Sequence, residues 1–131
     1  MRTCNQDMAG ILIVEDEKII AQDLKMTLNN FGYDVPAIAS SGEDAIIKTA
    51  EIIPDLILMD IMLAGELNGI ETAKQILGKH SIPLIYISAY ADENTILAAK
   101  ETKPFGYLVK PFEEQELHSI IRIALGKEEV N

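Results

Sequence analysis

The amino-acid sequence predicts a single α/β domain, a doubly wound parallel sheet of five strands with helices on both faces. Short apolar runs alternate strictly with segments of helical period along the 131 residues, without a repeat, low-complexity stretch or internal linker. Short connections between alternating strands and helices require right-handed crossovers, and therefore a parallel sheet covered on both faces. We expect the domain to span residues 10–126, between a flexible leader at 1–9 and a C-terminal tail or linker start at 127–131.

The first two strands and helices are marked by a change of period and by end signals. Gly10–Val14 is a continuous apolar run rich in β-branched residues and too short for a typical helix, which predicts a strand buried on both faces. A helix over 18–31 follows, because apolar side chains recur on one helical face until a glycine ends it. A weaker strand at 35–39 leads to a helix that Ser41 caps and that ends before Pro54.

The remaining elements continue this alternation. A buried apolar run, Leu56 to Met59, leads directly into Asp60, and the last helix has an apolar face of helical period. The predicted elements are a strand at 56–59, a helix at 69–77, a strand at 82–87, a helix at 92–101, a strand at 105–109 and a helix at 113–125.

Composition excludes several classes of protein. Hydrophobic residues make up 48% of the chain, which rules out the composition of a disordered protein. No apolar run approaches the roughly 20 residues that span a bilayer, and the polar residues 1–9 do not resemble a signal peptide, so we expect a cytoplasmic protein with no membrane contact. A formal charge of −10 disfavours nucleic-acid binding. The single cysteine, Cys4, is expected to be a free thiol.

Five polar residues follow four of the predicted strands, and the carboxyl ends of parallel strands meet at one edge of a sheet. They are Glu15, Asp16, Asp60, Ser88 and Lys110. Three carboxylates brought together repel one another and stay ionised only beside a cation. Oxygen ligands suit Mg²⁺ or Mn²⁺, and the flexible charge of a lysine suits a phosphoryl oxygen or a carboxylate.

Each of these residues also has a simpler interpretation. Glu15 or Asp16 alone could cap the following helix, Ser88 alone could be an ordinary N-cap, and Lys110 alone could be a surface lysine. Asp60 is different, because four apolar residues bring it to a strand end and no helix starts directly after it. The occurrence of all five residues at one edge favours a site.

These motifs together resemble the receiver domain of two-component response regulators, over about residues 10–125. The motifs are Glu15-Asp16 after the first strand, Asp60 after the third, Ser88-Ala89 after the fourth, and Tyr107-Leu108-Val109-Lys110-Pro111-Phe112 around the end of the fifth. The resemblance implies a flavodoxin-like fold with strand order 2-1-3-4-5.

The resemblance also implies roles for individual residues. Asp60 would be the phosphoacceptor, and its second oxygen would bind Mg²⁺. Asp16 would ligate the metal directly, Glu15 directly or through a water, and Met62 through its backbone carbonyl. The loop at 61–69 is one residue longer than the family's usual pattern and has Ala64 in place of a common proline, which leaves the position of the Met62 carbonyl open.

Three further residues would complete the switch. Lys110 would hold the phosphoryl oxygens together with the metal, and its peptide bond to Pro111 would be cis. Ser88 would be the switch hydroxyl and Tyr107 the aromatic partner that responds to it. The phosphoryl donor would be a histidine kinase or phosphotransfer protein, and the output would pass to an effector protein or domain outside this chain. The fourth helix, last strand and last helix are the family's usual homodimer surface.

Three other functions remain open at this point. A small-molecule phosphatase or phosphotransferase would need a second aspartate two residues after Asp60, where the chain has Met62. A nucleotide- or flavin-binding module would need a glycine-rich first turn, whereas residues 15–18 are Glu-Asp-Glu-Lys. A degenerate receiver would bind partners without phosphorylation, which the complete set of five residues disfavours. We therefore expect catalysis limited to the chain's own phosphorylation and dephosphorylation.

Overall fold

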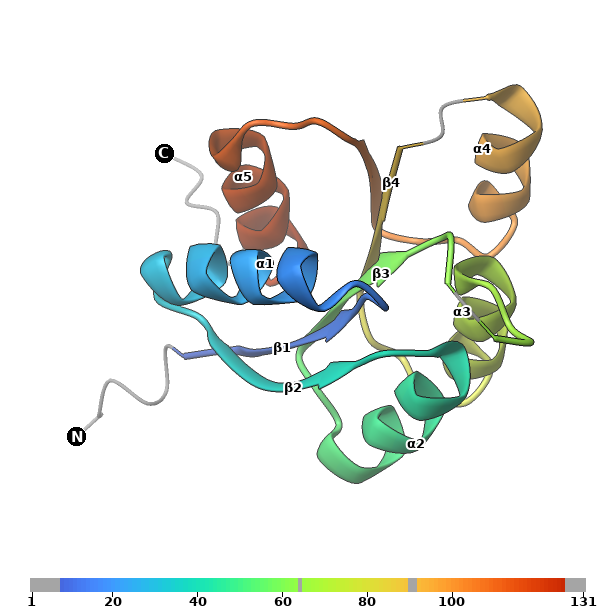
Figure 1. Cartoon of the computed structure of the whole chain (residues 1–131), viewed down its shortest axis with the longest axis horizontal. Helices are drawn as coiled ribbons and strands as arrows, with labels where there is room; N and C mark the ends of the chain where they lie inside the picture. The colour runs from blue at the N-terminus through green and yellow to red at the C-terminus, as the bar shows by residue number, and fades with distance from the viewer. Residues whose placement is uncertain (1–7, 64, 90–91, 127–131) are drawn as a thin grey trace.

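Five parallel strands form one sheet in the order β2-β1-β3-β4-β5 (Figure 1). The computed structural model describes residues 8–63, 65–89 and 92–126, so residues 1–7 of the expected leader at 1–9, and the whole expected tail at 127–131, lie outside the described residues. The strands are β1 (Gly10–Val14), β2 (Asp34–Ala39), β3 (Leu56–Asp60), β4 (Leu84–Ser88) and β5 (Gly106–Val109). The doubly wound α/β fold and the 2-1-3-4-5 order are confirmed.

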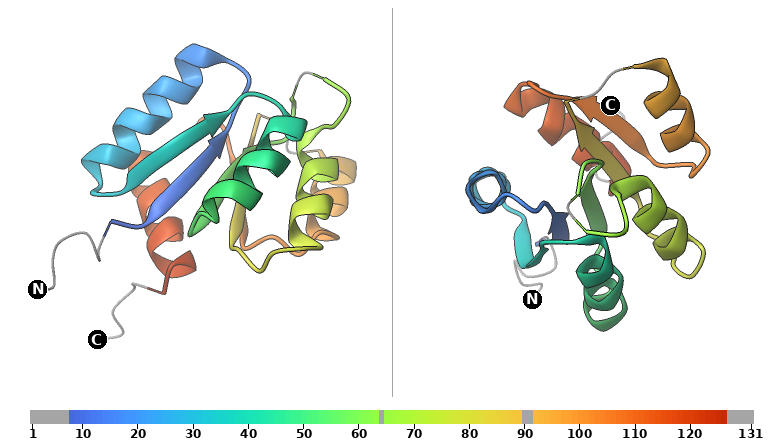
Figure 2. Two further views of the ribbon diagram at one scale, coloured as in Figure 1. Left: turned by 90° about the horizontal axis from the view of Figure 1, so that it is seen from below. Right: turned by 45° about the vertical axis from the view of Figure 1, so that its right-hand side comes forward.

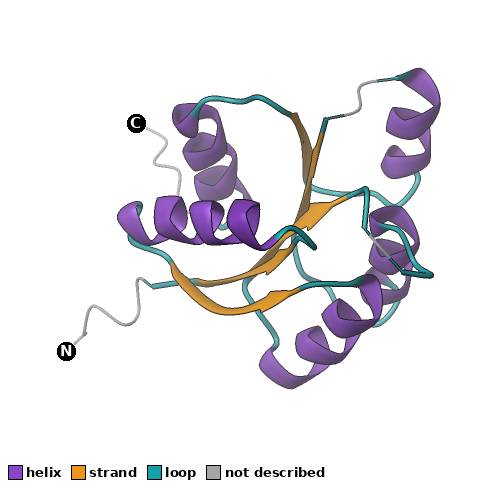
Figure 3. Cartoon of the chain, in the orientation of Figure 1, coloured by secondary structure: helices purple, strands orange, loops and turns teal. Residues whose placement is uncertain are grey.

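Helices cover both faces of the sheet (Figures 2 and 3). Alternate residues of β1 point to opposite faces, so Ile11 and Ile13 join one buried cluster and Leu12 and Val14 the other. The first cluster includes residues of α1 and α5, and the second includes residues of α2, α3 and α4. The helices are α1 (Lys18–Asn30), α2 (Gly42–Ile52), α3 (Gly69–Leu77), α4 (Glu93–Lys100) and α5 (Glu114–Ala124).

The helix end signals read from the sequence act as predicted. Gly32 adopts a left-handed φ of 99°, and the next amide, that of Tyr33, donates to the carbonyl oxygen of Leu28 at 3.0 Å, which closes the end of α1. At the start of α2, the amide of Asp44 donates to Ser41 Oγ at 3.0 Å. None of the described helices has the length and apolar character needed to cross a membrane.

The start of the fourth strand differs from the prediction. The ladder between β3 and β4 begins at Leu84, opposite Ile57, rather than at residue 82. Pro83 has no N–H to donate to a neighbouring strand, although its carbonyl oxygen accepts the Ile57 amide at 3.0 Å. Ile82 is buried in the same cluster as Leu84 and Tyr86 of β4. This burial explains why the sequence has an apolar residue there, as a strand would.

Two buried threonines allow a matched test of hydrogen bonding in the helices. Thr49 and Thr72 are both fully buried, but Thr72 Oγ1 donates to the carbonyl oxygen of Asn68 at 2.8 Å, whereas Thr49 Oγ1 has no partner among the described residues. Because a buried hydroxyl without a partner is costly, Thr49→Val should raise the unfolding free energy by about 1 kcal/mol. Urea denaturation measures this change.

Thr72→Val is the control, since the same substitution there removes a hydroxyl that has a partner. It should lower the unfolding free energy by about 1 kcal/mol, because the hydrogen bond from Thr72 Oγ1 to the Asn68 carbonyl is lost, although that carbonyl still accepts the Thr72 amide at 3.0 Å. Equal effects of the two substitutions would contradict the assignment.

Candidate functional site

The carboxyl edge of the sheet gathers polar residues from the ends of four strands. Glu15 and Asp16 follow β1, Asp60 ends β3, Ser88 ends β4 and Lys110 follows β5. The edge is rigid there, because Glu15 N donates to the Ala39 carbonyl at 2.9 Å and all five residues of both β3 and β4 are buried. The predicted meeting of strand ends is therefore present in the structure.

Three carboxylates lie together at this edge. Glu15, Asp16 and Asp60 each offer an oxygen within 4.8 Å of the others'. Glu15 is 3% exposed and Asp60 9%, while Asp16 is half-buried. Charges this close and this poorly hydrated repel one another strongly unless a cation neutralises them.

The surroundings of Glu15 disfavour its charged form. Burial raises the pKa of Glu15 from 4.5 to about 7, and the Asp60 carboxylate adds to the rise. Two contacts oppose it: Glu17 N–H donates to Glu15 Oε2 at 3.1 Å, and Lys110 Nζ lies 3.6 Å from Glu15 Oε1. The N-cap residue of α1 is Glu17, so neither Glu15 nor Asp16 occupies the capping position of that helix.

The Asp60 carboxylate is held by the backbone that follows it. Asp60 pairs with Ile87 across β3 and β4, and its Oδ1 accepts the Met62 N–H at 3.2 Å. Only a short loop separates Asp60 from α3, and Gly69 N–H donates back to the Ile61 carbonyl at 2.8 Å. The Met62 side chain is 55% exposed and its amide donates to Asp60, so the residue does lie beside the Asp60 carboxylate. Ala64 lies outside the described residues.

The carboxylate cluster fits a small divalent cation. Ligands about 2.1 Å from an octahedral Mg²⁺ lie about 3 Å apart when adjacent and about 4.2 Å apart when opposite. Oxygens already within 4.8 Å of one another need only small side-chain movements to reach that geometry. All the side-chain donors are carboxylates, which suit Mg²⁺ or Mn²⁺ rather than a softer metal.

Ser88 and Tyr107 are directly connected. Ser88 is fully buried at the end of β4, and Tyr107 is half-buried on the neighbouring strand. Burial raises the pKa of Tyr107, and a side-chain hydrogen bond shared with Ser88 lowers it. Ser88 is not an N-cap, because Asp92 caps α4 by accepting the Thr95 amide at 3.0 Å.

Tyr86 is a third member of this group that the sequence reasoning did not single out. Its ring centroid lies 6.0 Å from that of Tyr107, its hydroxyl lies 2.7 Å from Thr102 Oγ1, and burial raises the pKa of Tyr86 to about 12. The sequence spacing could have identified Tyr86, because a residue two positions before Ser88 on the same strand lies on the same face of the sheet as Ser88.

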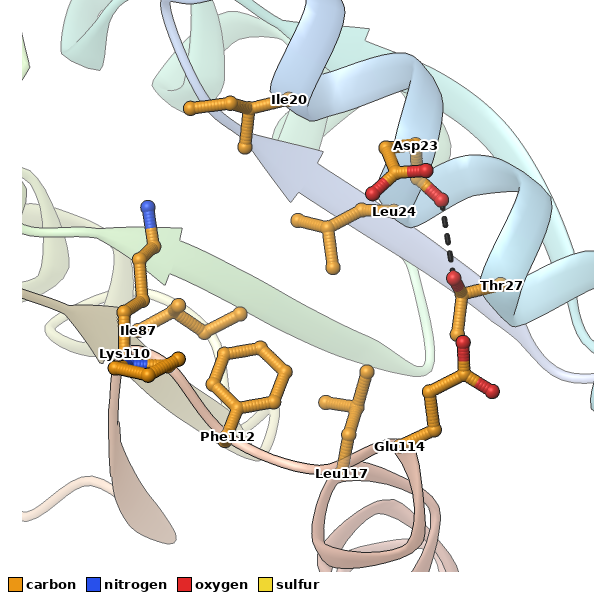
Figure 4. Close-up of a pocket in the computed structure, with 10 residues that line it drawn as sticks. Ile20, Asp23, Leu24, Thr27, Ile87, Lys110, Phe112, Glu114 and Leu117 are labelled. Atoms are coloured by element: carbon orange, nitrogen blue, oxygen red, sulfur yellow. Dashed lines mark hydrogen bonds between the residues drawn. The ribbon is translucent and has the colours of Figure 1, made fainter.

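Lys110 connects the last strand to the carboxylates. Its amide donates to the Ser88 carbonyl at 2.8 Å, and the expected cis peptide bond to Pro111 is present. The stem of Lys110 lines one end of a cleft of about 380 Å³ between α1 and the β5–α5 connection (Figure 4). Leu24 and Phe112 are among the apolar residues that line this cleft. The cleft is open to solvent and lies next to the carboxylate cluster through their shared neighbour Lys110.

Comparison with known protein families gives a match over most of the chain. The family described as the response regulator receiver domain matches residues 11–122. Among curated proteins, the transcriptional regulatory protein PdtaR of Mycobacterium tuberculosis is 31% identical over 117 residues, which is 89% of this chain and 57% of that protein. The DNA-binding response regulator MtrA of Mycolicibacterium smegmatis is 31% identical over 119 residues, 91% of this chain and 51% of that protein.

Solved structures show the same fold. The signal receiver domain of a modulated diguanylate cyclase from Desulfovibrio desulfuricans has a TM-score of 0.86 and 40% identity, over 92% of this chain and 96% of that one. The response regulator domain of Thermotoga maritima CheB has a TM-score of 0.82 and 27% identity, over 93% and 99%. The chain thus spans nearly the whole of these domains, but about half the length of the curated relatives.

The raised pKa of Glu15 predicts a pH dependence of stability without metal. Between about pH 4.5 and 7, folded Glu15 keeps a proton that the unfolded chain has released, so the unfolding free energy should fall as pH rises. The rise in pKa corresponds to a total of about 3 kcal/mol. Urea denaturation in the presence of a chelator measures it.

Glu15→Gln is the control, because it removes the ionisation and keeps the shape. The variant should show a flatter profile and be more stable than the natural sequence at pH 7.5 without metal. Parallel profiles for the two proteins would rule out Glu15 as the source.

Proposed function

The chain belongs to the receiver domain family of response regulators, and from this membership we propose that it is a phosphorylation-dependent signalling switch with Asp60 as phosphoacceptor. The observation that carries the proposal is the cluster of three carboxylates within 4.8 Å, with Lys110 3.6 Å from one of them. No other arrangement in the described residues combines a metal-binding cluster, a nearby cation and a nucleophile at a strand end.

The proposed chemistry is phosphoryl transfer to a carboxylate. An Asp60 oxygen forms a bond to phosphorus while the phosphorus–nitrogen bond of a phosphohistidine breaks, and the histidine nitrogen recovers a proton. The product is an acyl phosphate on Asp60. Because the transition state of phosphoryl transfer is loose and highly charged, positioning and neutralisation of charge account for most of the catalysis.

Glu15, Asp16 and Asp60 would hold Mg²⁺ or Mn²⁺, with Glu15 acting directly or through a water and the Met62 carbonyl completing the protein ligands. The bound cation would neutralise phosphoryl oxygens and permit all three carboxylates to ionise together. Glu15 supports this assignment, because burial, together with the neighbouring Asp60 carboxylate, raises its pKa and so disfavours its charged form when no cation is present.

Lys110 and Ser88 would bind the phosphoryl group from the other side. Lys110 already lies 3.6 Å from Glu15, and exchanging that carboxylate for a phosphoryl oxygen requires only side-chain rotation of a flexible lysine. The Ser88 hydroxyl would donate to another phosphoryl oxygen. Both residues are held in register by the bond between the Lys110 amide and the Ser88 carbonyl.

Tyr107 would report the state of Asp60 to the surface. Ser88 shares a hydrogen bond with Tyr107 in the structure, so turning the Ser88 hydroxyl toward a phosphoryl oxygen must change that bond. Tyr107 is half-buried and packs against the cluster that includes Tyr86, which gives its ring two environments within reach. A change in the exposure of this ring would alter the surface formed by α4 and β5.

The proposal extends to partners. A histidine kinase or phosphotransfer protein would supply the phosphoryl group in the cytoplasm, and an effector protein or attached domain would receive the signal. The formal charge of −10 argues that nucleic acid is not bound by this chain itself, and we propose no membrane contact. The surface of α4, β5 and α5 would serve any homodimer. Catalysis would be limited to the chain's own phosphorylation and dephosphorylation.

Phosphorylation can be tested with a small donor. Incubated with Mg²⁺ and acetyl phosphate, the protein should gain the mass of one phosphoryl group, and Asp60→Asn should gain none, because the amide is not a nucleophile. Intact-mass spectrometry measures the gain. A chelator should prevent it.

Asp55→Asn is a matched control, since Asp55 is exposed and its carboxylate accepts the Gly10 amide at 2.7 Å, at the amino ends of β1 and β3 and therefore at the opposite edge of the sheet from the site. It should be phosphorylated normally. Failure of the natural sequence to gain mass with any donor would favour the degenerate receiver, and turnover of a phosphorylated substrate would favour the small-molecule enzyme.

The switch can be tested at the tyrosine rings. Phosphorylation should shift the NMR signals of the Tyr107 ring, and Ser88→Ala should still be phosphorylated on Asp60 but show a much smaller shift, because the connection is lost. Tyr33, which packs in the buried cluster on the opposite face of the sheet, should not shift in either protein. An unchanged Tyr107 signal in the phosphorylated natural sequence would refute this role.

A further inference from the structure

Gly69, the first residue of α3, lies directly against the backbone of the phosphoacceptor. A Cβ atom on Gly69 would overlap the carbonyl oxygen of Asp60 and lie 2.7 Å from the Cα of Ile61. Both are backbone atoms, so neither can rotate away. The Gly69 amide also donates to the Ile61 carbonyl at 2.8 Å, which draws the start of the helix toward this peptide.

Gly42, the first residue of α2, makes a second close approach, to Leu67 and Thr72, which lie farther from Asp60 than Gly69 does. A Cβ atom there would overlap Thr72 Oγ1 and lie 2.9 Å from the Cβ and 3.2 Å from the carbonyl oxygen of Leu67. Thr72 cannot easily give way, because it is fully buried and its hydroxyl donates to the Asn68 carbonyl. Gly42 therefore lies against the first turn of α3 and the loop end before it.

Space, rather than backbone conformation, is what these two positions require. Gly32 and Gly65 adopt left-handed φ angles of 99° and 103°, but Gly42 and Gly69 have no positive φ. Alanine at the start of a helix is otherwise at least as favourable as glycine. The absent side chain matters here only because it lets two helices come close to the loop after Asp60.

The geometry of that loop in turn determines where the Asp60 carboxylate points. Met62 N–H donates to Asp60 Oδ1 at 3.2 Å, so a shift of the backbone at 61–62 moves a contact of the carboxylate itself. The carboxylate must meet the oxygens of Glu15 and Asp16 within a few ångströms for the three to share a cation. Displacement by a methyl group would therefore disturb both metal binding and in-line attack.

We propose that Gly42 and Gly69 are positioning residues for phosphoryl transfer, which let α2 and α3 hold the peptide after Asp60 in its reactive geometry. This inference rests on the proposed function of Asp60. Neither residue touches the phosphoryl group or the metal. Gly69 acts through the Asp60–Ile61 backbone, and Gly42 acts through Leu67 and Thr72.

The test compares Gly42→Ala and Gly69→Ala with Gly10→Ala, whose added Cβ would meet Pro36 Cγ at an ordinary 3.5 Å. Calorimetry gives the Mg²⁺ affinity, and intact mass gives the phosphorylation rate at saturating Mg²⁺ and acetyl phosphate, under conditions where urea denaturation shows each protein to be folded. Both test variants should bind Mg²⁺ more weakly and react about 10- to 100-fold more slowly, whereas Gly10→Ala should match the natural sequence.

A rescue separates positioning from folding. Gly42→Ala combined with Thr72→Ala removes the hydroxyl that the new methyl group meets, so it should react faster than Gly42→Ala alone. If the variants lose only unfolding free energy, while the rate and Mg²⁺ affinity of the folded molecules stay unchanged, the proposal is wrong. If Gly69→Ala does not fold, the rates and Mg²⁺ affinities of Gly42→Ala and of its double variant with Thr72→Ala test the proposal. If the natural sequence itself is not phosphorylated, the proposed function fails first, and this inference falls with it.

Discussion

The crowding of Glu15, Asp16 and Asp60 at one edge of the sheet is the constraint on which the rest of the site depends. Three oxygens within 4.8 Å, two of them on buried residues, would separate if the backbone were free to move. They remain together because each is attached to the end of a buried parallel strand whose hydrogen bonds fix its position. The packing of the sheet thus holds the three carboxylates together, and burial, with a contribution from Asp60, raises the pKa of Glu15.

The two strands beside this cluster hold the groups that would respond to a phosphoryl group. Ser88 and Lys110 are joined through their backbones, and Ser88 is joined to Tyr107 through their side chains. A charge added to Asp60 would therefore be sensed on β4 and transmitted to β5 without a large rearrangement of the fold. Small movements suffice because the strands carrying these residues are already adjacent.

The other boundary of the site is formed by helices rather than strands. The loop after Asp60 is confined between β3 and the start of α3, which a capping box of Asn68 and Glu71 makes rigid. The start of this loop stays close to the end of β3, since the Met62 amide donates to the Asp60 carboxylate at 3.2 Å.

The sequence by itself determined the order of the elements, the parallel sheet and the meeting of five polar residues, because hydrophobic period and short connections leave few alternatives. Only the tertiary structure decided that Ser88 faces Tyr107 rather than capping α4, and that Tyr86 joins them. It also decided the close approach of α2 and α3 to the loop after Asp60. Strand ends are set by local pattern, whereas such contacts depend on how helices far apart in the chain pack against one another.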